Sequence, residues 1–263
     1  MKHTQLGTVI AVANQKGGVG KTTTSINLGA SLAALDKHVL LLDLDPQGNT
    51  TSGLGVDKHS VRKGMYDVLM REATLESVIL PTSCEGLKLV PASMDLAGAE
   101  VELVSQAQRE HILDQMFADY AGEHFDYVII DCPPALNLLT LNALKASDRV
   151  LVTLQTEFYA MEGLTQLLDT IRRVRSHLNK SLHLDGILLT LCDRRNNLAQ
   201  QVESEVRDYF GNQVYQTVIP RNVRLSEAPS FGIPAMHHDI RSSGAQAYLE
   251  AAQEMIQRHE SGM

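Results

Sequence analysis

The sequence contains no tryptophan, only three cysteines and no long hydrophobic run. The cysteines, Cys84, Cys132 and Cys192, are too widely spaced for a disulfide framework or for a metal site built on C-x-x-C. No apolar segment approaches the ~18 residues needed to cross a bilayer. The first residues also lack the pattern of a secretory signal peptide. These absences favour a protein of the reducing cytoplasm.

The chain also lacks an excess of positive charge. Its 23 lysines and arginines are outnumbered by 31 acidic residues, which gives a net charge of -8. This balance argues mildly against nucleic acid as a partner, although binding depends on where charge is located. With 263 residues, 44% of them hydrophobic, the chain can bury a large core without disulfides or metals. No linker or low-complexity stretch interrupts it, so we expect one domain over residues 1–263.

Short apolar runs alternate with longer periodic segments, a pattern typical of an α/β fold. The runs span Thr8–Ala13, His38–Asp43, Leu87–Pro91, Tyr127–Asp131, Arg149–Leu154 and Leu184–Leu191. The periodic segments span Thr22–Leu35, Leu96–Phe117, Leu138–Ala146, Met161–Leu178, Ala199–Phe210 and Ser242–His259. Valine-, isoleucine- and leucine-rich runs without polar alternation indicate strands buried on both faces of a mostly parallel sheet. The alternation predicts a twisted sheet with helices on both faces, and a C-terminal helix at about 242–259.

The most informative motif is a glycine-rich loop between the first predicted strand and the first predicted helix. It begins at Asn14 and ends in Gly-Lys-Thr at residues 20–22. Glycines let successive backbone N–H groups point into one concavity that binds phosphate, and the following helix adds its positive end. The standard phosphate loop requires glycine where this chain has Gln15. A glycine-rich turn that merely begins a buried helix is the alternative interpretation.

Residues Lys16 to Thr23 resemble the deviant Walker A box of the ParA/MinD group of ATPases. The resemblance implies a P-loop NTPase fold with ATP and Mg²⁺ as cofactors. It assigns ATP binding to Lys16, Gly17, Gly18, Val19, Gly20, Lys21, Thr22 and Thr23. It also implies that Lys16 reaches across a nucleotide-sandwich homodimer to the partner's ATP, where a second cation stabilises charge on the phosphates. A solvated loop lysine is the alternative for Lys16.

Two predicted strands end in acidic residues, where an α/β sheet usually binds its ligand. Asp43 and Asp45 follow the second strand, and Asp131 precedes Cys132-Pro133-Pro134. The resemblance gives Asp45 the activation of the attacking water, and it places Asp43 near the signature lysine or the Mg²⁺ shell. Asp131 fits a Walker B carboxylate, so the predicted metal ligands are Thr22, Asp45 and Asp131. Ordinary turn chemistry remains the alternative for the Asp43–Asp45 segment, and Cys132 is best interpreted as a small buried residue.

Further along the chain, residues 218–229 are similar to the chromosome- and plasmid-partitioning branch, the ParA/Soj type. This resemblance suggests that the loop 192–194 and the segment 220–222 flank the adenine, with Asp193, Pro220 and Asn222 as the candidate contacts, although Asp193 could equally cap the next helix. It also places Arg195, Arg221 and Arg224 on a DNA-binding surface. Residues 172–224 contain nine lysines and arginines against five acids, a net charge of +4 in this acidic chain. Phosphate contacts of this kind bind duplex DNA without regard to sequence.

The resemblance therefore implies a cytoplasmic, nucleoid-associated ATPase that segregates DNA. A ParB-type protein bound to a centromere-like site would stimulate hydrolysis and release the DNA. The alternatives are a membrane-cycling regulator of the MinD kind and a metal-cluster carrier. The C-terminal residues 248–260 carry three glutamates and one arginine, the wrong sign for anionic lipid, so we expect no membrane partner. The loop begins within twenty residues of the first methionine, so we expect no N-terminal helix-turn-helix extension.

Overall fold

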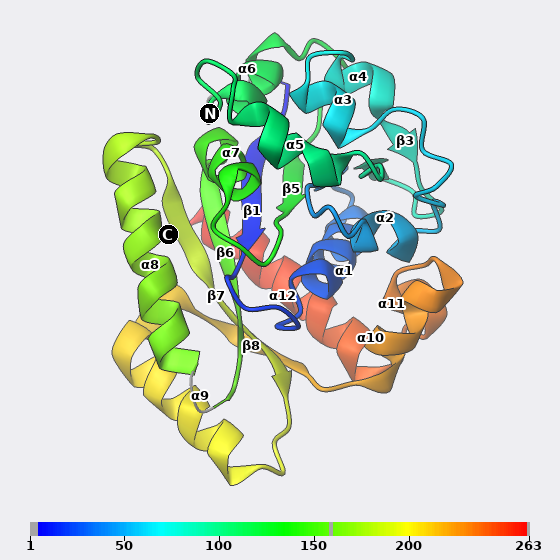
Figure 1. Cartoon of the computed structure of the whole chain (residues 1–263). Helices are drawn as coiled ribbons and strands as arrows, with labels where there is room; N and C mark the ends of the chain where they lie inside the picture. Colours follow the sequence, from blue (N-terminus) through cyan, green and yellow to red (C-terminus); the bar gives the residue numbers. More distant parts are fainter. Residues whose placement is uncertain (1–4, 158–159, 262–263) are drawn as a thin grey trace.

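A computed structural model describes residues 5–157 and 160–261 of the chain. Its eight strands form a single sheet in the order β3-β4-β2-β5-β1-β6-β7-β8 (Figure 1). The strands are β1 Thr8–Ala13, β2 Val39–Asp43, β3 Leu80–Pro81, β4 Leu87–Val90, β5 Tyr127–Asp131, β6 Arg149–Gln155, β7 His183–Cys192 and β8 Val214–Pro220. All neighbouring pairs are parallel except β3 with β4. The predicted mostly parallel sheet is confirmed.

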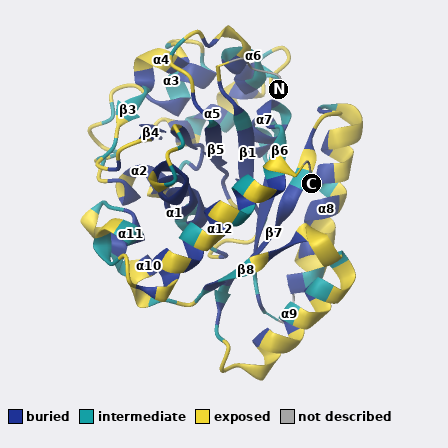
Figure 2. Cartoon of the chain, turned by 180° about the vertical axis from the view of Figure 1, so that it is seen from behind, coloured by how far each residue is buried: buried dark blue, intermediate teal, exposed yellow. Residues whose placement is uncertain are grey.

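Helices cover both faces of this sheet. The longer ones are α1 Lys21–Ala34, α5 Leu96–Leu103, α6 Ile112–Asp119, α7 Leu138–Ala146, α8 Ala160–His177, α9 Asn197–Phe210 and α12 Ser243–Glu260. The short ones are α2 Asn49–Gly53, α3 Met65–Leu69, α4 Leu75–Val78, α10 Val223–Glu227 and α11 Ala235–His238, with 3-10 turns at Gly211–Gln213 and Ala228–Phe231. Helices α1 and α12 share one face, and α5 to α9 cover the other (Figures 1 and 2).

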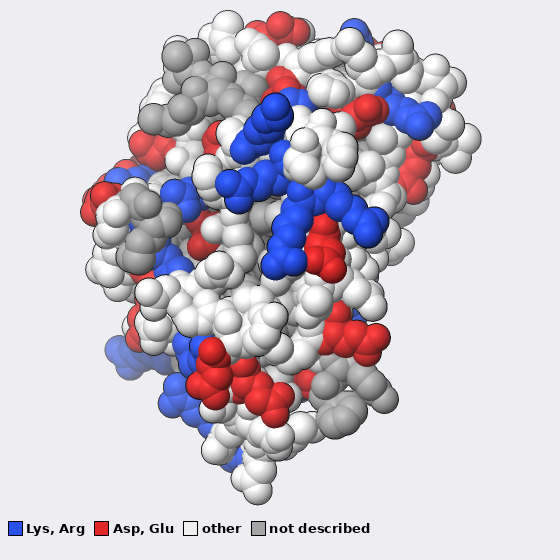
Figure 3. Space-filling model, turned by 90° about the vertical axis from the view of Figure 1, so that its left-hand side faces the viewer, with Lys and Arg blue, Asp and Glu red and all other residues white. Residues whose placement is uncertain are grey.

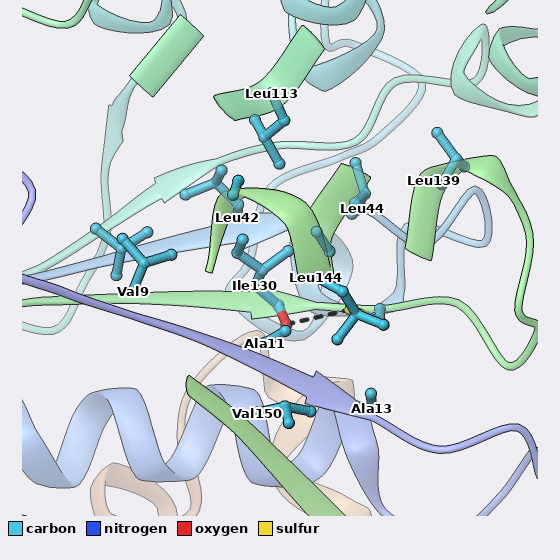
Figure 4. Packing of buried hydrophobic residues seen from close by; sticks show 14 of the residues in the cluster. Val9, Ala11, Ala13, Leu42, Leu44, Leu113, Ile130, Leu139, Leu144 and Val150 are labelled. Carbon is cyan, nitrogen blue, oxygen red and sulfur yellow. Dashed lines mark hydrogen bonds between the residues drawn. The ribbon is translucent and has the colours of Figure 1, made fainter. Parts of the chain in front are cut away.

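The central strand β1 supplies both halves of the core. Val9 and Ala11 point into the cluster beneath α5 to α8, whereas Ile10 points into the cluster beneath α1 and α12. Figure 4 shows the first cluster, in which Val9 and Ile130 of neighbouring strands lie beneath the helices. Since successive strand residues point to opposite faces, a strand covered on both sides needs apolar residues throughout. This explains why the sequence shows continuous apolar runs.

The six predicted strands are all present, but two further strands were missed. Strand β3 has only two residues, and β8 is a partly exposed edge strand with Gln216 and Thr217 in its middle. The prediction of one helix over Leu96–Phe117 was wrong, because α5 ends at Leu103 and α6 begins at Ile112. The Asn142 side chain accepts a hydrogen bond from the Leu113 backbone N–H (3.2 Å) and donates one to the Arg109 carbonyl (2.8 Å). A side chain distant in sequence therefore holds the interruption.

The C-terminal helix α12 starts one residue later than predicted. Ser242 caps it by accepting a hydrogen bond from the Ala245 backbone N–H at 3.2 Å. Its buried face includes Tyr248, Ala251 and Met255, which pack in the cluster shared with α1. Figure 2 shows α12 crossing the sheet with buried and exposed residues alternating along it. Within the described ranges, no helix combines the length and the apolar character needed to span a bilayer.

Candidate nucleotide-binding site

The phosphate loop connects β1 to α1 at the carboxyl edge of the sheet. Gly18 (φ 76°) and Gly20 (φ 84°) adopt left-handed conformations, which glycine reaches at little steric cost. No atom lies within 4 Å of the position that a Gly18 Cβ would occupy, so the loop is open there. Val19 is buried, and its carbonyl accepts a hydrogen bond from the Thr190 hydroxyl of β7 at 2.8 Å. Strand β7 therefore fixes the curvature of the loop.

The two loop lysines have opposite environments. Lys21 is buried at the start of α1, and its Nζ donates a hydrogen bond to the Lys16 carbonyl at 3.0 Å. Burial lowers the pKa of Lys21, and the nearby Asp131 carboxylate opposes this shift. Lys16 is exposed and forms an ion pair with Glu157, which follows β6. Sequence reasoning did not identify Glu157, because no local pattern links residues 141 positions apart.

Asp131 lies at the centre of a buried hydroxyl cluster. One carboxylate oxygen accepts hydrogen bonds from the hydroxyls of Thr22 (2.8 Å) and Thr50 (2.7 Å). The other accepts one from Ser25 at 3.0 Å. Burial raises the pKa of Asp131, while these hydroxyl donors pull it down. Asp131 and Thr22 come together as the sequence predicted. Ser25 and Thr50 were missed. Hydroxyl residues beside the phosphate loop and after the Asp45 turn could have indicated them.

The two acidic residues after β2 have different contacts. Asp43 is buried and accepts hydrogen bonds from the Thr51 backbone N–H (2.7 Å) and hydroxyl (2.6 Å). Burial and the adjacent Asp131 carboxylate raise the pKa of Asp43. Asp45, also buried, accepts one hydrogen bond from the Gln47 backbone N–H at 2.9 Å. The contacts of Asp43 are those of a residue that anchors α2, whereas Asp45 keeps acceptor capacity for a ligand.

A pocket of about 340 Å³ lies at the ends of β7 and β8. Its lining consists of Cys192, Arg194, Val218, Pro220, Ser243, Gln246, Ala247 and Glu250. Pro220 was predicted to flank the base and does line this pocket. Asp193 and Asn222 are not among the lining residues, because Asp193 is held by Arg195 and Asn222 caps α10 through the Arg224 backbone N–H at 2.8 Å. Arg194 belongs to the loop 192–194 that was predicted to flank the base, whereas Gln246 and Glu250 lie on α12, far along the chain, and were missed.

Of the predicted DNA-binding arginines, Arg195 and Arg221 lie on loops, and Arg224 lies in α10. Arg195 is 90% exposed and donates to both carboxylate oxygens of Asp193 at 2.9 Å, which lowers the pKa of Asp193 to about 2. Arg224 donates to Glu227 at 2.7 Å. Arg221 is exposed, and within the described part of the chain no carboxylate pairs with it. Two of the three predicted cations are therefore already partly neutralised.

The positive window of residues 172–224 does not form one face. Arg172, Arg173 and Arg175 lie at the C-terminal end of α8, and Lys180 lies between α8 and the start of β7. Arg194 and Arg195 follow the end of β7, ten residues further along. At about 3.3 Å per residue, the two groups are separated by roughly 30 Å. The net charge of +4 therefore combined cations that lie at opposite ends of β7.

Comparisons with known proteins identify the family. Residues 7–184 match the model of a family described as "AAA domain". The sporulation initiation inhibitor protein Soj of Bacillus subtilis is 54% identical over 250 residues, 95% of this chain and 98% of that protein. The chromosome partitioning protein ParA of Caulobacter vibrioides is 54% identical over 251 residues, 95% and 94% of the two chains.

The chain belongs to the ParA/Soj family of chromosome-partitioning ATPases.

Solved structures agree with the ParA/Soj fold. A Mycobacterium smegmatis structure described as cobyrinic acid a,c-diamide synthase, with bound ATP analog and magnesium, superposes with a TM-score of 0.85 at 40% identity, covering 98% of both chains. The cell division ATPase MinD of Pyrococcus furiosus superposes with a TM-score of 0.79 at 25% identity, covering 96% and 99%. Because the higher identities belong to partitioning proteins, we assign the ParA/Soj activity class and not the diamide synthase one.

Proposed function

We propose that residues 1–263 act as one ATPase domain that couples ATP binding to reversible attachment to DNA. ATP joins two copies face to face, and the homodimer binds double-stranded DNA without regard to sequence. A ParB-type partner then stimulates hydrolysis and releases the DNA. The protein would act in the cytoplasm, on the nucleoid. The observation that carries this proposal is the open phosphate loop, with buried Lys21 behind it and Thr22 hydrogen-bonded to Asp131.

The residues around the loop suit ATP and Mg²⁺. Hydroxyl and carboxylate oxygens are the ligands that Mg²⁺ prefers, and Thr22, Asp45 and Asp131 offer such oxygens. Asp131 is fully buried behind two threonine hydroxyls, so it would act on the ion through Thr22 or a water molecule. The bound ion would neutralise charge on the phosphates. The backbone N–H groups from Gly17 to Thr23 would bind the phosphate oxygens.

Three side chains carry the proposed chemistry. Lys21 would exchange its hydrogen bond with the Lys16 carbonyl for one with the β- and γ-phosphates. Asp45 would orient the attacking water, since a carboxylate with a free oxygen can accept its proton. Lys16 would leave Glu157 and stabilise the transition state in the partner's site. An ion pair between two exposed side chains contributes only about 0.2–1 kcal/mol, so the exchange from Glu157 to a triphosphate is favourable.

The pocket at the ends of β7 and β8 is where we place the adenine. Thr190 holds the loop, and Cys192, two residues later on the same strand, lines the pocket. Pro220 offers an apolar wall. We retain Asp193 and Asn222 as neighbours of the base, although Asp193 is paired with Arg195 and Asn222 caps α10. The proposed DNA surface comprises Arg195, Arg221 and Arg224, and the two paired arginines would have to exchange a carboxylate for a phosphate.

The membrane-cycling alternative receives no support from α12. A helix that lies on a membrane needs a free apolar face, whereas the apolar residues of α12 pack against α1. Its single arginine, Arg258, is buried and donates to the carbonyls of Asn212 (3.0 Å) and Val214 (2.9 Å). We therefore favour DNA as the surface to which the ATP-bound dimer attaches.

A complementation experiment tests the proposed dimer. A Lys16→Ala protomer keeps Asp45, and an Asp45→Ala protomer keeps Lys16, so neither homodimer should hydrolyse ATP. In a mixed dimer, one site would combine its own Asp45 with the partner's Lys16. We expect phosphate release to return on mixing, because that site is complete. If the mixture stays inactive while each variant still binds ATP, the proposal that Lys16 acts across the dimer is wrong.

A further inference from the structure

A hollow lies between the C-terminal ends of α8 and α9, at the edge of the sheet opposite the phosphate loop. Its volume is about 320 Å³. The residues that line it are Leu168, Ile171, Arg172, Arg175, Leu182, Leu184, Tyr209, Phe210 and Gln213. We refer to it as the α8–α9 groove. The α8 residues among them are spaced three, four and seven apart, so they form one face of that helix.

The floor of the groove is apolar and one wall is aromatic. Leu168, Ile171 and Leu182 are buried core residues. Tyr209 is 75% exposed, and its ring lies edge-on to Phe210 with 4.7 Å between the ring centroids. A large, rigid, amphipathic side chain at the rim of an apolar hollow is typical of an anchor point in protein–protein recognition.

Arg172 and Arg175 line the groove although the chain as a whole is acidic, and the neighbouring cations Arg173 and Lys180 do not line it. Arg172, Arg173, Arg175 and Lys180 are all exposed. Of these four, Arg172 has a carboxylate partner in the described residues, Asp169 at 2.7 Å. Figure 3 views the side of the molecule that carries α8 and shows Lys and Arg side chains gathered in its upper half. The negative end of the helix dipole stabilises cations at this position, but it does not account for the hollow beside them.

We propose that the α8–α9 groove binds an acidic peptide segment of a partner protein. A leucine or aromatic side chain of the peptide would fill the apolar hollow, and flanking carboxylates would pair with Arg172 and Arg175. Arginine binds carboxylates through two parallel hydrogen bonds, which gives the contact geometric specificity. Duplex DNA fits less well, because it has no apolar side chain to enter the hollow. The groove lies roughly 30 Å from the end of β7, so binding should not require ATP.

The test uses a set of fluorescent ten-residue peptides in which a single Phe or Leu is flanked by Glu and Asp, and a matched set with Lys in place of the acids. We expect acidic peptides to bind the unmodified protein with a Kd below ~1 mM in fluorescence anisotropy, equally with and without ATP. Arg175→Glu and Tyr209→Ala should each weaken binding about tenfold or more. Arg173→Glu, the same charge reversal on a residue outside the groove, is the matched control and should change binding less than about twofold.

Three results would overturn the proposal: no acidic peptide binds, the lysine peptides bind equally well, or Arg173→Glu weakens binding as much as Arg175→Glu. The last result would indicate diffuse charge instead of a groove. Displacement of the peptide by duplex DNA, together with DNA binding that Arg175→Glu abolishes, would assign the surface to DNA instead. Unchanged ATP hydrolysis by all three variants confirms that they are folded. Since no step requires ATP, failure here leaves the proposed DNA-segregation function untouched.

Discussion

Thr50 provides a sharp test of the Asp131 cluster, because sequence reasoning assigned it no role. Its buried hydroxyl donates a hydrogen bond to the Asp131 carboxylate at 2.7 Å. The variant Thr50→Val keeps the shape of the side chain and removes that donor. A hydrogen bond to a charged group stabilises a protein by about 1.5–3 kcal/mol. For a domain of this size each kcal/mol corresponds to ~2–4 °C, so the melting temperature should fall by about 3–12 °C.

The loss should depend on pH. Burial raises the pKa of Asp131, and the Thr50 hydroxyl lowers it, so the variant should have a still higher pKa there. A carboxyl group whose pKa is raised in the folded state favours folding below its ordinary pKa, near 4, and this contribution is lost as pH rises through the folded pKa. Because Thr50→Val raises the folded pKa of Asp131 further, the stability of the variant falls over a wider pH range. Thr50→Val should therefore be more destabilising at pH 8 than at pH 4.5.

Thr140→Val is the matched control for this experiment. The Thr140 hydroxyl is equally buried, but it donates to the neutral Ala135 carbonyl at 2.6 Å. Its loss should cost about 0.5–1.5 kcal/mol, with no difference between the two pH values. Differential scanning calorimetry of the unmodified protein and both variants, each at both pH values, gives the six melting temperatures that are needed. Equal and pH-independent losses in the two variants would refute the account of Asp131 as a buried carboxylate that needs its hydroxyl donors.

Three further predictions concern the proposed site. Lys21→Ala should weaken ATP binding about 10- to 100-fold, because a charge-assisted phosphate contact is lost; unchanged affinity in calorimetric titration would argue against the phosphate-loop assignment. Asp45→Ala should still bind ATP and accumulate as a dimer without hydrolysis, whereas a monomer on gel filtration with ATP would indicate a structural role. Arg195→Glu and Arg224→Glu should weaken mobility shifts of unrelated duplexes alike, since phosphates carry no sequence information; undiminished binding by both would place the DNA surface elsewhere.

The sequence predicted most of what local pattern determines. Strands such as Tyr127–Asp131, buried on both faces, appear as continuous apolar runs, and the glycines of the phosphate loop mark a turn that few other residues could form. Strand β8 was missed because an edge strand that is partly exposed has no such run. The interruption between α5 and α6 was missed because Asn142, thirty residues away, holds it in place.

Features of the site that depend on distant contacts were not predictable. The donors around Asp131 come from α1 and α2, more than eighty positions away along the chain. The ion pair of Arg195 with Asp193 is local, but whether two neighbouring charges meet depends on the backbone of the loop between them. The net charge of residues 172–224 was a misleading signal, because the length of β7 separates the cations before this strand from those after it.

DNA binding in three nucleotide states tests the central claim most directly. Mobility shifts of two unrelated duplexes would be titrated with ATP, with ADP and without nucleotide, at several salt concentrations. We predict strong binding of both duplexes in the presence of ATP, and not with ADP or without nucleotide. Each phosphate contact adds about 0.9 to the magnitude of the slope of log binding constant against log salt concentration. Arg224→Ala should lower that magnitude by up to ~1.8, since a dimer presents the residue twice. Failure to bind either duplex in any state, or equal binding in all three, would contradict ATP-controlled attachment to DNA.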